Sequence, residues 1–202
     1  MIPLLPHSEH HRRFEQSHPC VTSNIPVGAT LLEVTVGLLI FSILLTFSIP
    51  SYYQALERNR FKRTVHTLFD DLNYAKQLAN HHKRSISICP TINQTHCSDN
   101  PQHWADGWLL FFDDDATWSP SDASIIRVTE LIKSPKNLTI NPNRNIAQGL
   151  SIAPLRRMGK TQGTGLPNGR FTLCANAQTK VTIYINVFGI PRLEASDQSC
   201  HP

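Results

Sequence analysis

Three consecutive aspartates, Asp113 to Asp115, are the first residues whose type and spacing suggest chemistry. Carboxylate oxygens are ligands that Ca²⁺ prefers, but the run lacks the alternating spacing of a calcium-binding loop. A solvated turn is therefore the interpretation that we favour. The chain also has ten histidines, of which His81 and His82 are adjacent. Because neighbouring side chains on a helix point in different directions, we expect exposed histidines without a metal.

Sequence patterns typical of enzymes are absent from the chain. It contains no Gly-x-Ser-x-Gly, His-Glu-x-x-His or P-loop pattern. Five cysteines occur, but no two of them form the Cys-x-x-Cys pair that is typical of zinc sites. We therefore expect no catalytic residues, no metal and no cofactor, and a protein that is not an enzyme.

Charged residues are distributed unevenly along the second half of the chain. Residues 85–126 contain six acids and no Lys or Arg, which is a charge of −6, whereas residues 127–193 contain ten bases and one acid, which is +9. Either two oppositely charged faces pack together, or the basic half binds an anion such as DNA phosphate. The sequence shows little aromatic interleaving, so base stacking is not expected. Four bases flank a glycine-rich loop at 159–165: Arg156, Arg157, Lys160 and Arg170.

The size and composition of the chain fit one ordinary domain with an additional segment. The chain has 202 residues, of which 40% are hydrophobic and 17% are charged. This apolar content excludes a fully disordered chain. The net charge of +4 alone indicates little about partners.

An uncharged apolar run from Val34 to Ile49 is the additional segment. Extended back through Leu31 and Leu32, it reaches the roughly 18–20 residues that span a bilayer. A cleaved secretory signal and a buried core helix are the alternatives. The run is long for a signal and has no amphipathic break, so a membrane anchor is favoured. Glu33 lies at its edge, where an ionisable group needs a partner, and we expect that partner from another chain or from a new amino terminus.

The residues around this run resemble the processing site of type IV prepilins and pseudopilins. The matching residues are Gly28-Ala29-Thr30-Leu31-Leu32-Glu33, followed by Pro50 near the end of the apolar run. The resemblance implies that a prepilin peptidase cuts after Gly28 and methylates Ala29, a position where the family usually has Phe or Met. It also implies that Glu33 and Pro50 act in filament assembly, with Glu33 pairing with the new amine. Residues 1–28 would then be the cleaved leader.

A helical repeat continues beyond the apolar run and predicts one helix from about Ala29 to about Lys83. We expect Pro50 to bend this helix locally. Residues 29–51 would form its transmembrane or filament-core half and residues 52–84 its amphipathic half. The stripe expected to pack under a globular head comprises Phe61, Val65, Leu68, Leu72, Ala75 and Ala79.

Short β-like runs replace the helical repeat after Arg84, each bounded by Pro, Gly, Asn or Asp. They predict a head at residues 85–202, a small β-sandwich or curled sheet packed on the helix, and therefore an α+β fold. The expected strands are Ser85–Cys89, Trp108–Phe112, Ile125–Leu131, Leu138–Ile140, Leu150–Ala153, Phe171–Ala175 and Lys180–Phe188.

The head resembles the GspH/FimT group of pilin-like proteins. The residues that carry the resemblance are Ser85–Cys89, Cys97, Trp104–Asp113 and Gly169–Cys174. The group comprises a minor pseudopilin of type II secretion and a minor pilin of type IV pili implicated in DNA uptake. The resemblance implies a single-pass protein of the bacterial inner membrane with its head in the periplasm. Its partners would be the prepilin peptidase and other pilin or pseudopilin subunits.

Four cysteines remain once Cys20 is assigned to the implied leader. Four cysteines in an exported head permit two disulfides, with three possible pairings. We favour Cys89 with Cys97, which closes a small loop, and Cys174 with Cys200, which fixes the C-terminal tail.

DNA binding is the alternative function that the group suggests. In FimT-type proteins it is associated with a C-terminal Gly-Arg-x-Arg motif. Here the corresponding stretch, Gly189-Ile190-Pro191-Arg192, retains one arginine, and Gly169-Arg170-Phe171-Thr172 is also incomplete. The sequence thus predicts a structural minor subunit, with DNA capture through the basic C-terminal half as the second hypothesis.

Overall fold

The computed structural model of the chain describes residues 28, 30–131, 135–155, 159–161, 166, 168–175, 179–196 and 200. By internal contacts it divides into two compact units, Met1–Leu45 and Thr46–Pro202. Helix α1 (Leu31–His82) crosses this division and continues through Pro50. The predicted helix is therefore confirmed to within two residues at its start and one at its end.

Both ends of α1 follow from local chemistry. Thr30 precedes the helix, and its Oγ1 accepts a hydrogen bond from the backbone N of Glu33 at 3.2 Å. This contact satisfies one of the amide groups left unpaired at a helix start. At the other end, Lys83 adopts a φ of 57°, the left-handed conformation that commonly terminates helices.

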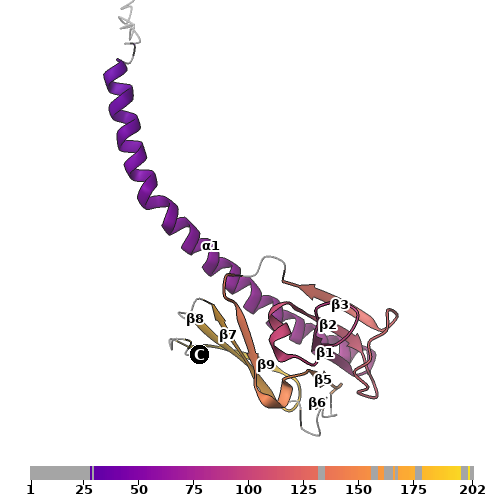
Figure 1. Cartoon of the computed structure of the whole chain (residues 1–202). Helices are drawn as coiled ribbons and strands as arrows, with labels where there is room; N and C mark the ends of the chain where they lie inside the picture. The colour runs from indigo at the N-terminus through magenta and orange to yellow at the C-terminus, as the bar shows by residue number, and fades with distance from the viewer. Residues whose placement is uncertain are drawn as a thin grey trace, which may run out of the picture. The chain divides into compact units, whose positions relative to one another are not determined.

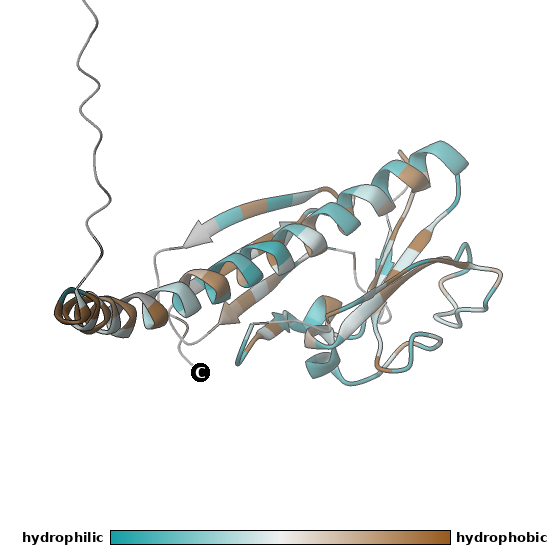
Figure 2. Cartoon of the chain, turned by 90° about the horizontal axis from the view of Figure 1, so that it is seen from above, coloured by the Kyte–Doolittle hydropathy of each residue, from teal (hydrophilic) through white to brown (hydrophobic). Residues whose placement is uncertain are grey.

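We call residues 31–51 the first part of α1 and residues 52–82 its second part. The first part has apolar side chains on all sides, seen as the brown stretch in Figure 2. Its most apolar 18 residues have a mean hydropathy of 2.2, and none of this stretch is buried by the described residues of the chain. By length and composition the helix is able to cross a membrane. Its exposed side chains include Leu38, Leu39 and Phe41.

The head contains two antiparallel sheets (Figure 1). The first has the order β3-β2-β1-β5-β6 and comprises β1 (Ile86–Pro90), β2 (Gly107–Phe112), β3 (Ile125–Glu130), β5 (Leu150–Ile152) and β6 (Lys160–Thr161). The second has the order β4-β7-β8-β9 and comprises β4 (Thr139–Pro142), β7 (Gly169–Ala175), β8 (Thr179–Ile185) and β9 (Pro191–Ser196). Two short 3-10 helices connect strands, η1 (Pro101–Ala105) and η2 (Arg144–Ile146).

One hydrophobic core joins the second part of α1 to both sheets. All six residues of the predicted stripe are buried in it, which confirms that part of the prediction. Sheet residues such as Ile88 and Ile183 complete the same cluster. Trp104 of η1 is fully buried; its ring centroid lies 4.7 Å from that of Phe171, and its Nε1 donates to the carbonyl of Ala147 at 2.9 Å. The α+β class is thus confirmed.

The strand predictions need three corrections. β9 was not predicted, because it begins at Pro191 and its outer positions are polar. The last predicted strand ends at Ile185 rather than at Phe188, since residues 186–190 form the turn that leads into β9. β6 was also missed, since it is only two residues long. As a result, Lys160 lies in a strand, paired with Ser151, and not in the glycine-rich loop expected at 159–165.

Candidate functional site

The residues expected to guide processing and assembly lie around the start of α1. Gly28 has open space where a side chain would project, and Ala29 lies outside the described residues. Glu33 is exposed in the first turn of α1. Among the described residues its carboxylate has no ion pair or hydrogen bond within the chain. Cleavage, methylation and the assembly roles of Glu33 and Pro50 remain predictions.

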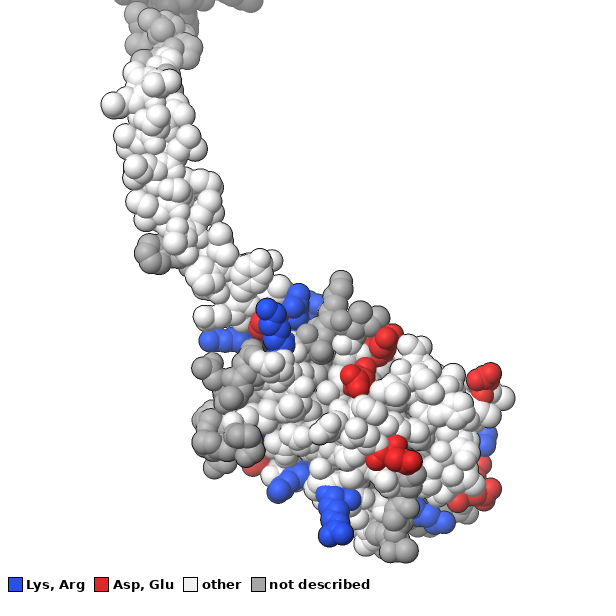
Figure 3. All heavy atoms as spheres, viewed as in Figure 1, with Lys and Arg blue, Asp and Glu red and all other residues white. Residues whose placement is uncertain are grey.

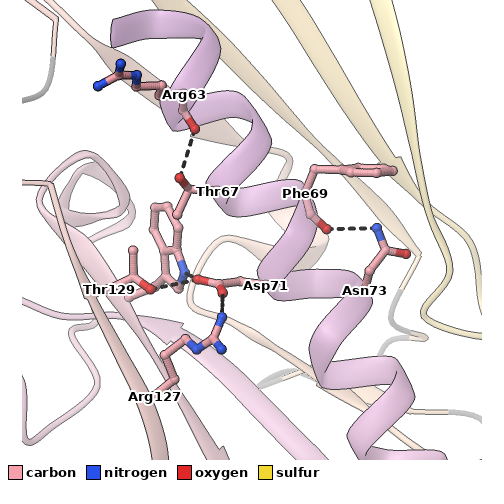
Figure 4. A network of polar contacts seen from close by, with 8 residues as sticks. Arg63, Thr67, Phe69, Asp71, Asn73, Arg127 and Thr129 are labelled. Atoms are coloured by element: carbon pink, nitrogen blue, oxygen red, sulfur yellow. Dashed lines mark hydrogen bonds and ion pairs between the residues drawn. The ribbon is translucent and has the colours of Figure 1, made fainter.

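A second acid of the same helix, Asp71, is in the opposite situation (Figure 4). Its side chain is 3% exposed and accepts hydrogen bonds from Trp108 Nε1 at 2.8 Å and Thr129 Oγ1 at 2.7 Å. Arg127 completes the site with an ion pair of 2.6 Å. The guanidinium of Arg127 also lies 4.3 Å from the ring centroid of Tyr74. Asp71 therefore ties α1 to β2 and β3 through three donors.

The aspartate triplet has a structural role that the sequence interpretation missed. Asp114 and Asp115 are exposed in a turn, as expected, whereas Asp113 is buried, so the expectation of a solvated turn is wrong for Asp113. Its carboxylate accepts from Ser87 Oγ at 2.8 Å and from the backbone N of Thr117 and of Trp118 at 2.8 and 3.2 Å. A buried carboxylate needs hydrogen-bond donors. The donors to Asp113 come from the loop after β2 and from Ser87, so these bonds fix the conformation of that loop.

Asp114 also ties the head to the residues that follow α1. It pairs with Arg84 at 2.7 Å and accepts from the backbone N of Ser85 at 2.9 Å. Arg84 in turn lies 4.5 Å from the ring centroid of Phe112. In the part of the chain that is described, no group of three or more His, Cys, Asp or Glu side chains is arranged to hold a metal.

The four cysteines form two disulfides, in the pairing that we favoured. Cys89 and Cys97 are joined across a sequence separation of 8 residues, with Cα atoms 5.5 Å apart. Cys174 and Cys200 are joined across 26 residues, with Cα atoms 6.0 Å apart. Both distances lie in the normal range for a disulfide.

The structure separates the five basic residues proposed for anion binding. Arg170 of β7 and Arg192 of β9 are both paired in register with Tyr184 of β8. Directly opposed residues of antiparallel strands have Cβ atoms about 4.5–5.5 Å apart, so the three side chains form one row on the outer face of the second sheet. Both arginines are exposed, and Tyr184 is 40% exposed. The sequence interpretation had missed this aromatic residue, because the row forms only by strand pairing.

The other three bases are placed differently. Lys160 is exposed on β6 of the first sheet, while Arg156 and Arg157 lie outside the described residues. Residues 127–193, which carry the ten bases, also contact α1 through the ion pair between Arg127 and Asp71. Arg170 and Arg192 are thus the members of the predicted set that the described structure brings together.

Comparisons with known proteins agree with the architecture. A crystal structure of the type IV minor pilin FimU from Pseudomonas aeruginosa (strain PAO1) is similar, with a TM-score of 0.51 and 20% sequence identity. The similarity covers 71% of this chain and 95% of that one. A second crystal form of FimU gives a TM-score of 0.49 at 19% identity, over 69% of this chain and 96% of that one. Among curated protein sequences, none matches significantly.

The similarity to FimU establishes a shared fold at this level of identity. The family follows from the sequence: the family model of the type II transport protein GspH matches residues 64–189. This match covers more than half of the chain, including the buried stripe of α1 from Val65 onward and strands β1 to β8. The chain therefore belongs to the GspH family of pilin-like proteins.

Proposed function

We propose that the chain is a minor pseudopilin or pilin subunit of a type II secretion or type IV pilus machine. Prepilin peptidase would cut after Gly28 and methylate Ala29, so that the mature chain begins at Ala29. The subunit would wait in the inner membrane with its head in the periplasm. It would then enter a filament together with other pilin or pseudopilin subunits, for protein secretion or pilus biogenesis.

The observation that supports this proposal most is the exposed apolar part of α1. None of its most apolar stretch is covered by the described rest of the chain. A surface of this kind needs a bilayer or other apolar helices around it. A filament core built from such helices provides the second environment, so the same side chains serve before and after assembly.

Glu33 would set the register of assembly. Its carboxylate has no ion-pair partner among the described residues, and a charge transferred to apolar surroundings is costly unless it is paired. The methylated amine of Ala29 of a neighbouring mature subunit would be that partner. A correctly placed subunit would satisfy both charges, while a misplaced one would leave both unpaired.

Filament incorporation of a Glu33→Ala variant tests this proposal. We expect normal membrane insertion and normal removal of the leader, but strongly reduced recovery of the variant in sheared filaments. Glu194→Ala, which removes an exposed acid from β9, is the matched control and should assemble normally. Wild-type levels of Glu33→Ala in filaments would refute the registering role, and a wild-type chain that keeps its first 28 residues would refute processing.

A second candidate function, DNA capture, is supported by the row of Arg170, Tyr184 and Arg192. Two cations beside an exposed aromatic ring provide phosphate contacts and a surface for base stacking. Fluorescence anisotropy with labelled DNA across a salt series tests this function on the full chain. Replacing both arginines with Gln should weaken binding. It should also make the slope of log binding constant against log salt concentration shallower by about 2, because two phosphate contacts are lost. The control Lys136→Gln/Arg144→Gln should bind as the wild type does; equal loss in both variants would mean that the row has no specific role.

A further inference from the structure

A basic cluster on α1 lies just beyond the apolar run. We define it as Arg58, Lys62 and Arg63, which are all exposed. In Figure 3, Lys and Arg side chains gather where the uncharged stretch of the helix ends. The guanidinium of Arg60 is engaged by Glu57 at 2.8 Å. The three side chains of the cluster have no ion pair among the described residues, so their charges are available to a partner.

The surface beside the cluster is hollowed. A shallow groove of about 630 Å³ runs along the helix and is lined by Lys62, Arg63 and His66, together with Asn59, Thr67 and Asp70. The opposite side of this helical segment is buried in the head at Phe61, Thr64 and Val65. The groove therefore belongs to the face of α1 that the head leaves open.

Spacing along the helix relates this cluster to a membrane surface. Leu31 to Ile49 spans about 28 Å at 1.5 Å per residue, which matches the roughly 30 Å hydrocarbon core of a bilayer. Tyr52 and Tyr53 follow and are exposed, as is typical of residues at the membrane interface. Arg58 lies about 8 Å further along the axis. Helical side chains tilt toward the N-terminus, which here is toward the bilayer.

We propose that Arg58, Lys62 and Arg63 bind the anionic headgroups of phospholipids on the side of the membrane where the head lies. This inference rests on the membrane anchoring proposed above. The complementary charge is the lipid phosphate, which attracts nearby Lys and Arg through a short-range, salt-screened field. Because Lys62 and Arg63 lie about 6–8 Å beyond Arg58 along the axis, the contribution falls in the order Arg58, Lys62, Arg63. The contact would hold the subunit at a fixed depth before it is lifted into a filament.

Lipid retention by the full chain tests this proposal. The protein is reconstituted in equal parts of phosphatidylcholine and phosphatidylglycerol, extracted in mild detergent, and its bound lipids are counted by native mass spectrometry. We expect phosphatidylglycerol to be enriched at least about fivefold, the factor for one cation at an anionic surface. The variant Arg58→Gln/Lys62→Gln/Arg63→Gln should lose this enrichment. The matched variant Lys136→Gln/Arg144→Gln/Lys180→Gln removes the same charge from the head and should keep it.

The possible failures can be told apart. Extraction of the wild type by alkaline carbonate would refute the anchoring itself, and the lipid site with it. A carbonate-resistant protein without phosphatidylglycerol enrichment would refute the lipid site alone. Enrichment that survives the triple substitution would also refute the lipid site. If the variant expressed in cells then lost co-purifying filament subunits, the cluster would be assigned to a protein partner instead. Single substitutions sharpen the test, because equal losses at Arg58 and Arg63 would contradict the expected dependence on distance.

Discussion

Glu33 and Asp71 are two acids of one helix with opposite surroundings. Glu33 is exposed beside an apolar run and has no ion-pair partner among the described residues. Asp71 is buried and is satisfied by Trp108, Thr129 and Arg127. A carboxylate that is satisfied within its own chain stabilises the fold. One that is not satisfied there is available for a partner outside the chain.

Apolar side chains of the same two parts of α1 show the same contrast. In the first part they occur on every side of the helix and are exposed, as at Leu39. In the second part they form one stripe, which includes Leu72 and is buried under both sheets. The first part thus depends on surroundings that the described chain does not supply, while the second part is complete within the fold.

Asp71→Ala should produce the largest loss of stability. It leaves Trp108 Nε1 and Thr129 Oγ1 without their acceptor, at about 1–3 kcal/mol each, and we expect a total cost of about 4 kcal/mol. The lost ion pair adds little, because the side chain of Arg127 is 45% exposed and stays in contact with water. Glu33→Ala should leave the free energy of unfolding of the head unchanged. Denaturant titration of the full chain in detergent, followed by near-UV circular dichroism, measures both variants.

Asp70→Ala is the matched control for Asp71, because it removes the neighbouring acid from an exposed position. It should change the free energy of unfolding by less than about 0.5 kcal/mol. If the Asp70 and Asp71 variants were equally stable, the hydrogen bonds drawn in Figure 4 would not contribute as argued.

Removing the disulfides tests whether cross-links stabilise the head alone. In the chain-entropy account, Cys174→Ser/Cys200→Ser should cost about 3.5 kcal/mol and Cys89→Ser/Cys97→Ser about 2.5 kcal/mol, because the first pair closes the longer loop. Thermal unfolding of both double variants checks this order. Far-UV circular dichroism of the unfolded head in detergent should still report the helix of the apolar run. Its simultaneous loss would show that the two parts of α1 depend on one another.

Leu72→Ala should destabilise the head by about 3 kcal/mol, through lost burial and the cavity left behind. Leu72 is fully buried in the core cluster. Leu39→Ala removes the same side chain from an exposed position and should leave the unfolding of the head unchanged. Both variants are compared by denaturant titration in the same detergent. A comparable loss in both would mean that the head also packs on the first part of the helix.

The helix and most strands were predictable because their signals are local. The stripe from Phe61 to Ala79 repeats at the helical period, and its burial was confirmed. The strand that begins at Thr179 alternates clearly between apolar and polar residues. β9 gave no such signal, because a proline begins it and an edge strand can place polar side chains toward solvent.

Features that depend on strand pairing were not predictable from spacing. The donors to Asp71 lie 37, 56 and 58 residues away in the sequence, and the periodicity of α1 alone does not identify them. Tyr184 joins Arg170 and Arg192 only because of the register of β7, β8 and β9. A one-residue shift of that register would move each of these side chains to the other face of the sheet.

Lys76 tests the contrast between the exposed first part and the buried second part of α1, and it has the smallest expected effect on stability. It lies in the second part of α1, and its Nζ donates to the carbonyl of Ala153 at 2.9 Å. Burial lowers the pKa of Lys76 below its usual value of 10.5, because desolvation disfavours the charged form. Between the folded-state pKa and 10.5 the unfolded chain binds more protons, so the stability contributed by this residue rises as the pH increases through that window.

Lys76→Met removes this titration while keeping a long apolar side chain. The free energy of unfolding of the wild type relative to the variant should therefore increase with pH, with a slope of at most about 1.4 kcal/mol per pH unit for one proton. The titrations of other lysines and tyrosines are common to both proteins and cancel in the difference. Urea titrations at a series of pH values up to 10.5 measure it. If the difference in free energy of unfolding did not change with pH, Lys76 would be in contact with water. The solvent-exposed face of α1 would then include Lys76, although its neighbours are buried.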